Sequence, residues 1–125
     1  MKLFTVEEAN DLLPVIRPQL EELQNQYASM SAFRETAKLA AQAANFGGGG
    51  MESGTGYVKS LYQIGKITTE LHQIGVQLKD YSRGLIDFPS TRNGKIILLC
   101  WQLGEVERIE WWHETEGGFE GRKPL

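Results

Sequence analysis

The sequence predicts an α+β fold, in which a long antiparallel helical hairpin packs on a three-stranded antiparallel sheet. Apolar residues recur every three or four positions over much of residues 5–79, which is the spacing of one side of a helix. From Gly84 onward they recur at every second position, which is the spacing of a strand. Asn93-Gly94 lies between two alternating segments and is a strong signal for a two-residue hairpin turn.

We expect one domain, residues 1–125, because this length suits a single core. The helical hairpin should span about 5–79, and the antiparallel sheet with its tail should span about 84–125. Residues 46–56 are rich in glycine and should form a flexible connector between the helices. Their glycine spacing matches neither a phosphate-binding loop nor a dinucleotide-binding turn.

The first helix should begin at a capping box formed by Thr5 and Glu8. Because proline removes a helical hydrogen bond, Pro14 and Pro18 should end a short helix near Leu12, and a long helix should restart with Pro14 in its first turn. This long helix carries a heptad seam of the coiled-coil type, made of Leu13, Ile16, Leu20, Leu23, Tyr27 and Met30.

A second helix is expected from about Tyr57 to Lys79, with the same three-four spacing, so the two helices should pair as an antiparallel hairpin. A helix of about 30 residues from Pro14 is roughly 45 Å long, whereas a compact chain of this size has a radius of gyration of about 14 Å. The first helix should therefore project beyond the sheet and leave apolar surface for another copy. This predicts a homo-oligomer, a dimer or higher, built through the helices.

Three strands are expected, at about 85–91, 96–102 and 108–114. The Asn93-Gly94 turn joins the first two, and Gly104-Glu105 should form a looser turn before the third. The tail after the third strand is rich in turn residues and should pack through Phe119.

The register of the first two strands follows from the turn. A two-residue turn pairs Arg92 with Lys95, and counting back places Asp87 directly opposite Cys100, so the two point to the same face. One face then carries an apolar core, Ile86, Phe88, Ile97, Leu99 and Trp101. The other carries Leu85, Asp87, Ile96, Leu98 and Cys100, and the third strand should add Ile109, Trp111 and His113 to it.

Asp87 is the residue of this second face that suggests a functional site, because a buried carboxylate is costly unless it is paired. Cys100, His113 and the adjacent Glu114 should lie near it, and His72, the only other histidine, could join them from the second helix. The arginines that could neutralise the carboxylate are Arg83, Arg108 and Arg122.

Three interpretations of this cluster are open. In the first, Asp87 is structural, held by an arginine or by His113, and Cys100 is a small buried apolar residue. In the second, Asp87, Cys100 and His113 hold zinc or another transition metal, although no C-x-x-C or H-x-x-x-H pair supports it. In the third, His113 is a base oriented by Asp87, with Cys100 as nucleophile, but a neighbouring carboxylate raises a thiol pKa, which opposes nucleophilic attack.

The composition disfavours two classes of partner. The net charge is −3 and lysine and arginine form no stripe, which disfavours nucleic acid and anionic membrane surfaces. One cysteine allows no intrachain disulfide, and the sequence shows neither a signal peptide nor a bilayer-spanning segment. We therefore expect a cytoplasmic protein.

Four segments resemble one known family. They are FTVEEANDLLPVIRPQLEEL at the start, ELHQIGVQLKDYSRGLIDFP in the middle, and LLCWQLGE and WWHETEGGFEGRKPL near the end. Together they resemble the prokaryotic domain of unknown function 2203 family over nearly the whole chain. This family is uncharacterised, so the resemblance implies no activity. Its motifs include Asp87, Cys100 and His113, the cluster reached from strand register.

The functional expectation is a non-catalytic binding or assembly module that homo-oligomerises and needs no cofactor. Two heptad seams and the absence of a strong catalytic motif favour it. The alternative is a metal-dependent or acid–base enzyme, with its site at Asp87, Cys100 and His113 and zinc or another transition metal as cofactor.

Overall fold

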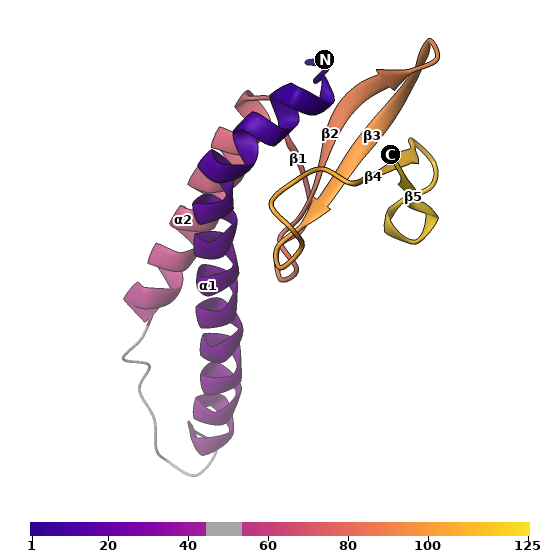
Figure 1. Ribbon diagram of the computed structural model, residues 1–125. Coiled ribbons are helices and arrows are strands. Elements are labelled where there is room, and N and C mark those ends of the chain that lie inside the picture. Colours follow the sequence, from indigo (N-terminus) through magenta and orange to yellow (C-terminus); the bar gives the residue numbers. More distant parts are fainter. Residues whose placement is uncertain (45–53) are drawn as a thin grey trace.

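The computed structural model describes residues 1–44 and 54–125. Two helices, α1 (Val6–Ala44) and α2 (Gly54–Gln73), form a hairpin that lies beside an antiparallel sheet (Figure 1), which is the expected α+β class. Residues 46–53 of the expected flexible connector lie outside the described residues, and residues 54–56 belong to α2.

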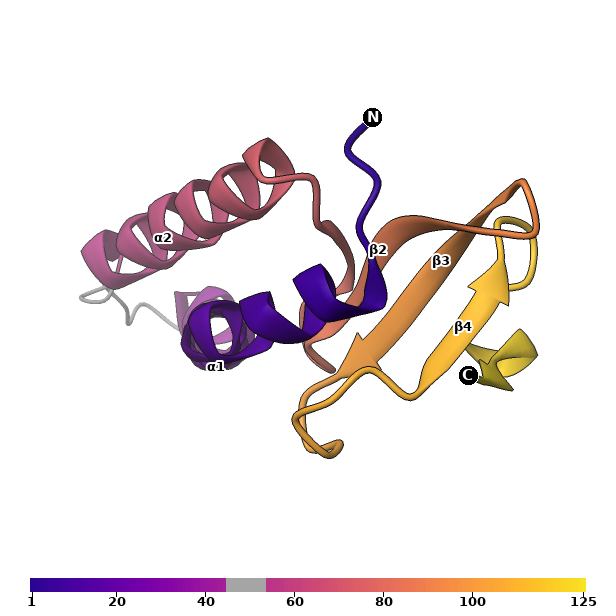
Figure 2. The ribbon, with the colours of Figure 1, turned by 45° about the horizontal axis from the view of Figure 1, so that its top comes forward.

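α1 is continuous through Pro14 and Pro18, so the expected break near Leu12 is wrong. Both prolines are exposed, and water can therefore satisfy the carbonyl groups that they leave without a helical donor. The first part of the helix bends toward the sheet in this region (Figure 2). The capping box is confirmed: the N–H of Glu8 donates to Thr5 Oγ1 at 3.1 Å, and the N–H of Thr5 donates to Glu8 Oε1 at 3.0 Å.

α2 ends at Gln73, earlier than expected, because a Schellman motif closes it. The N–H of Gly75 donates to the carbonyl of His72, and the N–H of Val76 donates to that of Leu71, both at 3.0 Å. Gly75 has a φ of 92°, a conformation that L side chains rarely adopt. The glycine therefore ends the helix and turns the chain toward the sheet.

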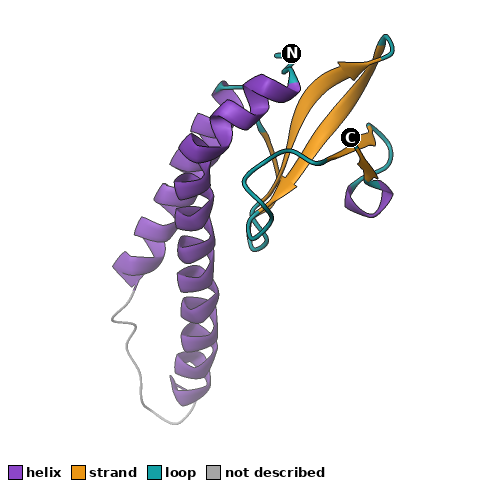
Figure 3. Ribbon diagram, in the orientation of Figure 1, coloured by secondary structure: helices purple, strands orange, loops and turns teal. Residues whose placement is uncertain are grey.

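The sheet has five antiparallel strands, not three, in the order β1-β2-β3-β4-β5 (Figure 3). The strands are β1 (Gln77–Asp80), β2 (Leu85–Arg92), β3 (Lys95–Gln102), β4 (Trp111–Glu114) and β5 (Lys123–Pro124). The two additional strands are the outer ones. β1 was expected to be helical because Leu78 continues the apolar spacing of α2, and β5 has only two residues.

The register of β2 and β3 is the expected one. Asn93 and Gly94 have φ values of 52° and 78°, as a type I′ turn requires. Arg92 pairs with Lys95, and Asp87 pairs with Cys100. The acid and the only cysteine of the chain therefore share one face of the sheet.

The other face of the sheet packs against the helices. Its buried core includes Leu13, Ile16, Leu20, Leu71, Phe88, Leu99 and Trp101. Asn10 Oδ1 accepts the backbone N–H of Ile109 at 2.6 Å, which ties α1 to the segment before β4. Ile109 itself lies in this core, so its expected place beside Asp87 is wrong: β4 begins only at Trp111, and Ile109 does not follow strand alternation.

Burial along the described part of α1 stops at Met30, although the helix continues to Ala44. Figure 1 shows this far half of the hairpin extending past the sheet. In the described residues, neither helix combines the length and the apolar character that crossing a bilayer requires.

Gly84 and Gly94 offer a matched test of the backbone, because both have positive φ, 60° and 78°. A Cβ on Gly84 would lie 2.6 Å from Leu103 Cγ, whereas a Cβ on Gly94 would meet nothing within 4 Å. We expect Gly94→Ala to lower the free energy of unfolding by about 1 kcal/mol. Gly84→Ala should lower it by about 3 kcal/mol, because overpacking adds to the backbone strain. Urea unfolding measures both, and equal losses would contradict the packing argument.

Candidate functional site

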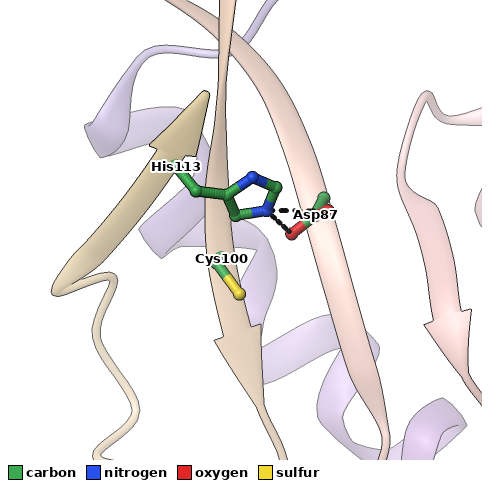
Figure 4. A group of neighbouring side chains, drawn as sticks. All are labelled: Asp87, Cys100 and His113. Atoms are coloured by element: carbon green, nitrogen blue, oxygen red, sulfur yellow. Dashed lines mark hydrogen bonds and ion pairs between the residues drawn. The ribbon is translucent and has the colours of Figure 1, made fainter. Parts of the chain in front are cut away.

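Three polar side chains meet on the face of the sheet that does not pack against the helices (Figure 4). Asp87 comes from β2, Cys100 from β3 and His113 from β4, and one ligand atom of each lies within 4.8 Å of the others. Their exposed fractions are 2, 1 and 2 %. β4 pairs His113 with Leu98 and Trp111 with Cys100, which confirms the expected face for both. The strand pairing alone therefore brings an acid, a thiol and an imidazole together.

Asp87 and His113 form a buried pair. His113 Nε2 lies 3.1 Å from both carboxylate oxygens of Asp87. His113 Nδ1 lies 2.7 Å from the backbone carbonyl of Glu114, which can only accept, so Nδ1 carries a hydrogen. With its one hydrogen on Nδ1, a neutral ring would direct the lone pair of Nε2 at the lone pairs of the ionised carboxylate. The pair therefore requires a cation between Nε2 and the carboxylate, either a proton or a metal ion.

The Cys100 thiol is protonated at neutral pH. Burial, followed by the negative charge of Asp87, raises the pKa of this thiol from 9.0 to about 12, and the Arg122 guanidinium partly opposes the shift. A thiol with such a pKa is a poor nucleophile, which weighs against the nucleophilic interpretation. A metal ion would reverse this state, because a coordinated thiol is deprotonated.

Arg122 lies beside the thiol. Its Nη1 is 4.0 Å from Cys100 Sγ and donates to Glu105 Oε1 at 3.0 Å. Its guanidinium packs over the rings of Trp111 and Phe119, at 4.9 and 4.1 Å from their centroids. These contacts hold the tail of the chain against the cluster.

A cavity of about 180 Å³ adjoins the three side chains. The other residues that line it are Lys79, Leu85, Leu98, Thr115, Gly118 and Phe119. The sequence reading missed Lys79 as a site residue because it assigned residue 79 to a helix. β1 pairs Gln77 with Asp87, and the helix-ending signal at Gly75 could have revealed this strand.

Two predicted site residues, His72 and Glu114, lie away from the cluster. His72 is exposed at the end of α2, beside a separate hollow of about 560 Å³. Glu114 follows His113 in β4, so its side chain points to the opposite face, where it lies 3.6 Å from Lys123 Nζ. The structure therefore reduces the predicted cluster to Asp87, Cys100 and His113.

The three predicted arginine partners each bind another residue. Arg83 Nε donates to Gln102 at 2.8 Å, Arg108 donates to Glu110 at 2.9 Å, and Arg122 pairs with Glu105. The partner of Asp87 is His113, the other candidate that the sequence offered.

A family model described as "Uncharacterized conserved protein (DUF2203)" matches residues 2–125. The chain belongs to this family. The resemblance of the four sequence segments is thus confirmed. Neither a curated protein nor a solved structure matches the chain. The family description states no activity, so the function has to be argued from the cluster.

Two substitutions at Asp87 test whether the hydrogen bond between Asp87 and His113 Nε2 stabilises this DUF2203 chain. An asparagine amide can donate a hydrogen to Nε2, so Asp87→Asn should lower the free energy of unfolding by at most about 1 kcal/mol. Asp87→Ala leaves Nε2 of the buried His113 without a partner and should cost about 3 kcal/mol. Urea unfolding in the presence of a chelator measures both. Equal costs would show that an asparagine amide cannot replace the carboxylate as the partner of Nε2.

Proposed function

We propose that the chain is a binding module that holds a divalent transition metal through Asp87, Cys100 and His113, with zinc as the preferred ion. The convergence of a carboxylate oxygen, a sulfur and an imidazole nitrogen within 4.8 Å carries this proposal. Zinc binds all three ligand types at roughly 2.0–2.3 Å, so a tetrahedral complex separates the ligand atoms by roughly 3.3–3.7 Å. Side-chain movements of about 1 Å would therefore complete the site.

The orientation of His113 supports the proposal. Metal-binding histidines generally donate their second ring N–H to a carbonyl or carboxylate, which fixes the ring and leaves the other nitrogen for the metal. The contact of Nδ1 with the Glu114 carbonyl has this arrangement, and it directs Nε2 toward Asp87.

The charge of the buried site favours a divalent ion. A carboxylate, a thiolate and a neutral imidazole together carry two negative charges, which one divalent ion neutralises. Burying an unbalanced charge is costly, so this ion should bind in preference to a monovalent one. The proton between Asp87 and His113 and the thiol proton of Cys100 would leave as the metal enters. A lone thiol ligand suits a reducing compartment, which supports a cytoplasmic location.

Protein purified without chelator should contain close to one zinc ion per chain, measured by plasma mass spectrometry. His113→Ala and Asp87→Asn should each remove the bound zinc, because each deletes a ligand, and the second keeps the hydrogen bond that stabilises the fold. His72→Ala is the matched control, because it changes the only other histidine, which is exposed.

Two results would contradict metal binding at Asp87, Cys100 and His113. One is wild-type protein that lacks metal and does not take up added zinc. The other is equal loss of zinc from the His72→Ala and His113→Ala variants.

We also propose that the module assembles as a homodimer through the helices. Val58, Leu61 and Tyr62 are exposed on α2, in the half of the hairpin that extends past the sheet. A groove beside them is lined by Glu22 from α1 and Lys59 from α2, among others. In a two-fold dimer each contact occurs twice, so Glu22 of each copy could form an ion pair with Lys59 of the other. This complementarity favours a second copy as the occupant.

An aspartate in place of the apolar Val58 should dissociate the dimer. The wild-type protein should sediment with twice the 14.0 kDa mass of one chain, and Val58→Asp should sediment as a monomer. Val106→Asp is the matched control, because Val106 is 61 % exposed and Val58 is 64 % exposed. Sedimentation equilibrium measures the masses. A wild-type monomer at the highest soluble concentration would refute the assembly.

A further inference from the structure

The three protein donors would leave a metal at this site with one open coordination position. In residues 1–44 and 54–125, no further histidine, cysteine, aspartate or glutamate joins Asp87, Cys100 and His113 as a fourth ligand. Structural zinc sites generally have four protein ligands, whereas sites with three bind water or an external ligand at the fourth position. All three side chains line the same cavity, so this position should face it.

The cavity is small and has two chemically different parts. Its volume of about 180 Å³ holds roughly six water molecules, and pockets for drug-sized ligands are larger, roughly 300–1,000 Å³. Leu85, Leu98 and Phe119 supply apolar walls, whereas Lys79 and Thr115 supply polar groups. A short molecule with one polar end and one apolar end fits this lining.

The charge of the ligand follows from the charges around it. A divalent metal with Asp87, Cys100 and His113 is neutral, so an anion at the fourth position brings one negative charge into the cavity. Among the described residues that line the cavity, Lys79 is the only basic one, and it can balance this charge.

We propose that the open metal position takes a short-chain carboxylate, with one carboxylate oxygen on the metal, its negative charge balanced by Lys79 and its tail between Leu85, Leu98 and Phe119. This inference rests on the proposed metal site. The apolar walls favour a carboxylate over an inorganic anion, because an inorganic anion has no tail to bury there.

Cobalt-loaded protein tests the inference, because the visible absorption of cobalt(II) reports a change of ligand. Butyrate should change the spectrum saturably, whereas butyramide, its neutral analogue, should not. Acetate should bind about tenfold more weakly than butyrate, because it lacks two methylene groups. Nitrate, an inorganic anion without a tail, should bind no better than acetate.

Lys79→Met should weaken butyrate binding about fivefold and leave the cobalt content unchanged, because Lys79 is exposed and its attraction for the anion is partly screened. Lys95→Met, at the β2–β3 turn, is the control and should bind butyrate as the wild type does. An unchanged butyrate affinity in Lys79→Met would overturn the role given to Lys79.

The cobalt experiment distinguishes failure of the carboxylate site from failure of the metal site. Protein that binds cobalt but shows no spectral response to butyrate, or an equal response to butyramide, overturns the carboxylate site and leaves metal binding intact. Protein that takes up neither cobalt nor zinc overturns both.

Discussion

The two-residue turn at Asn93-Gly94 determines which side of the sheet each residue of β2 and β3 faces. Its left-handed backbone pairs Arg92 with Lys95, and every pair below follows in order. A shift of one position would move the apolar set of one strand away from the helices and bring polar residues into the core. The packing of the helices and the meeting of Asp87 with Cys100 therefore depend on the same turn.

The two faces of the sheet contribute differently to the stability of the fold. The face toward the helices contains large apolar side chains such as Phe88 and Leu99, whose burial stabilises the fold. The opposite face contains a carboxylate, an imidazole and a thiol, whose burial costs stability unless each group is satisfied. Because these groups project from paired strands, their spacing is fixed more precisely than it would be on loops.

Sequence reasoning was accurate where local chemistry decides the structure and inaccurate where a distant contact decides it. The Asn-Gly turn gave the pairing of Asp87 with Cys100 because it depends on two adjacent residues. The apolar spacing around Leu78 favoured a helix, and only the left-handed conformation at Gly75 shows why the chain becomes a strand there. The sequence pattern of residues 108–114 put Ile109 on the Asp87 face, yet β4 begins only at Trp111. The hydrogen bond from the backbone of Ile109 to Asn10, far away in sequence, places Ile109 in the helix-facing core. Glu114 could have been excluded, because neighbours in a strand face opposite sides.

The spacing of the cluster along the chain sets the order in which it assembles. Cys100 lies midway between Asp87 and His113, which are 26 positions apart. The tight β2–β3 hairpin brings the acid and the thiol together through local contacts, which form fastest. The imidazole arrives only when β4 adds to β3, after a segment that is anchored to α1 through Ile109. A newly made chain therefore keeps its single thiol open to solvent oxidants until the last of these strands docks.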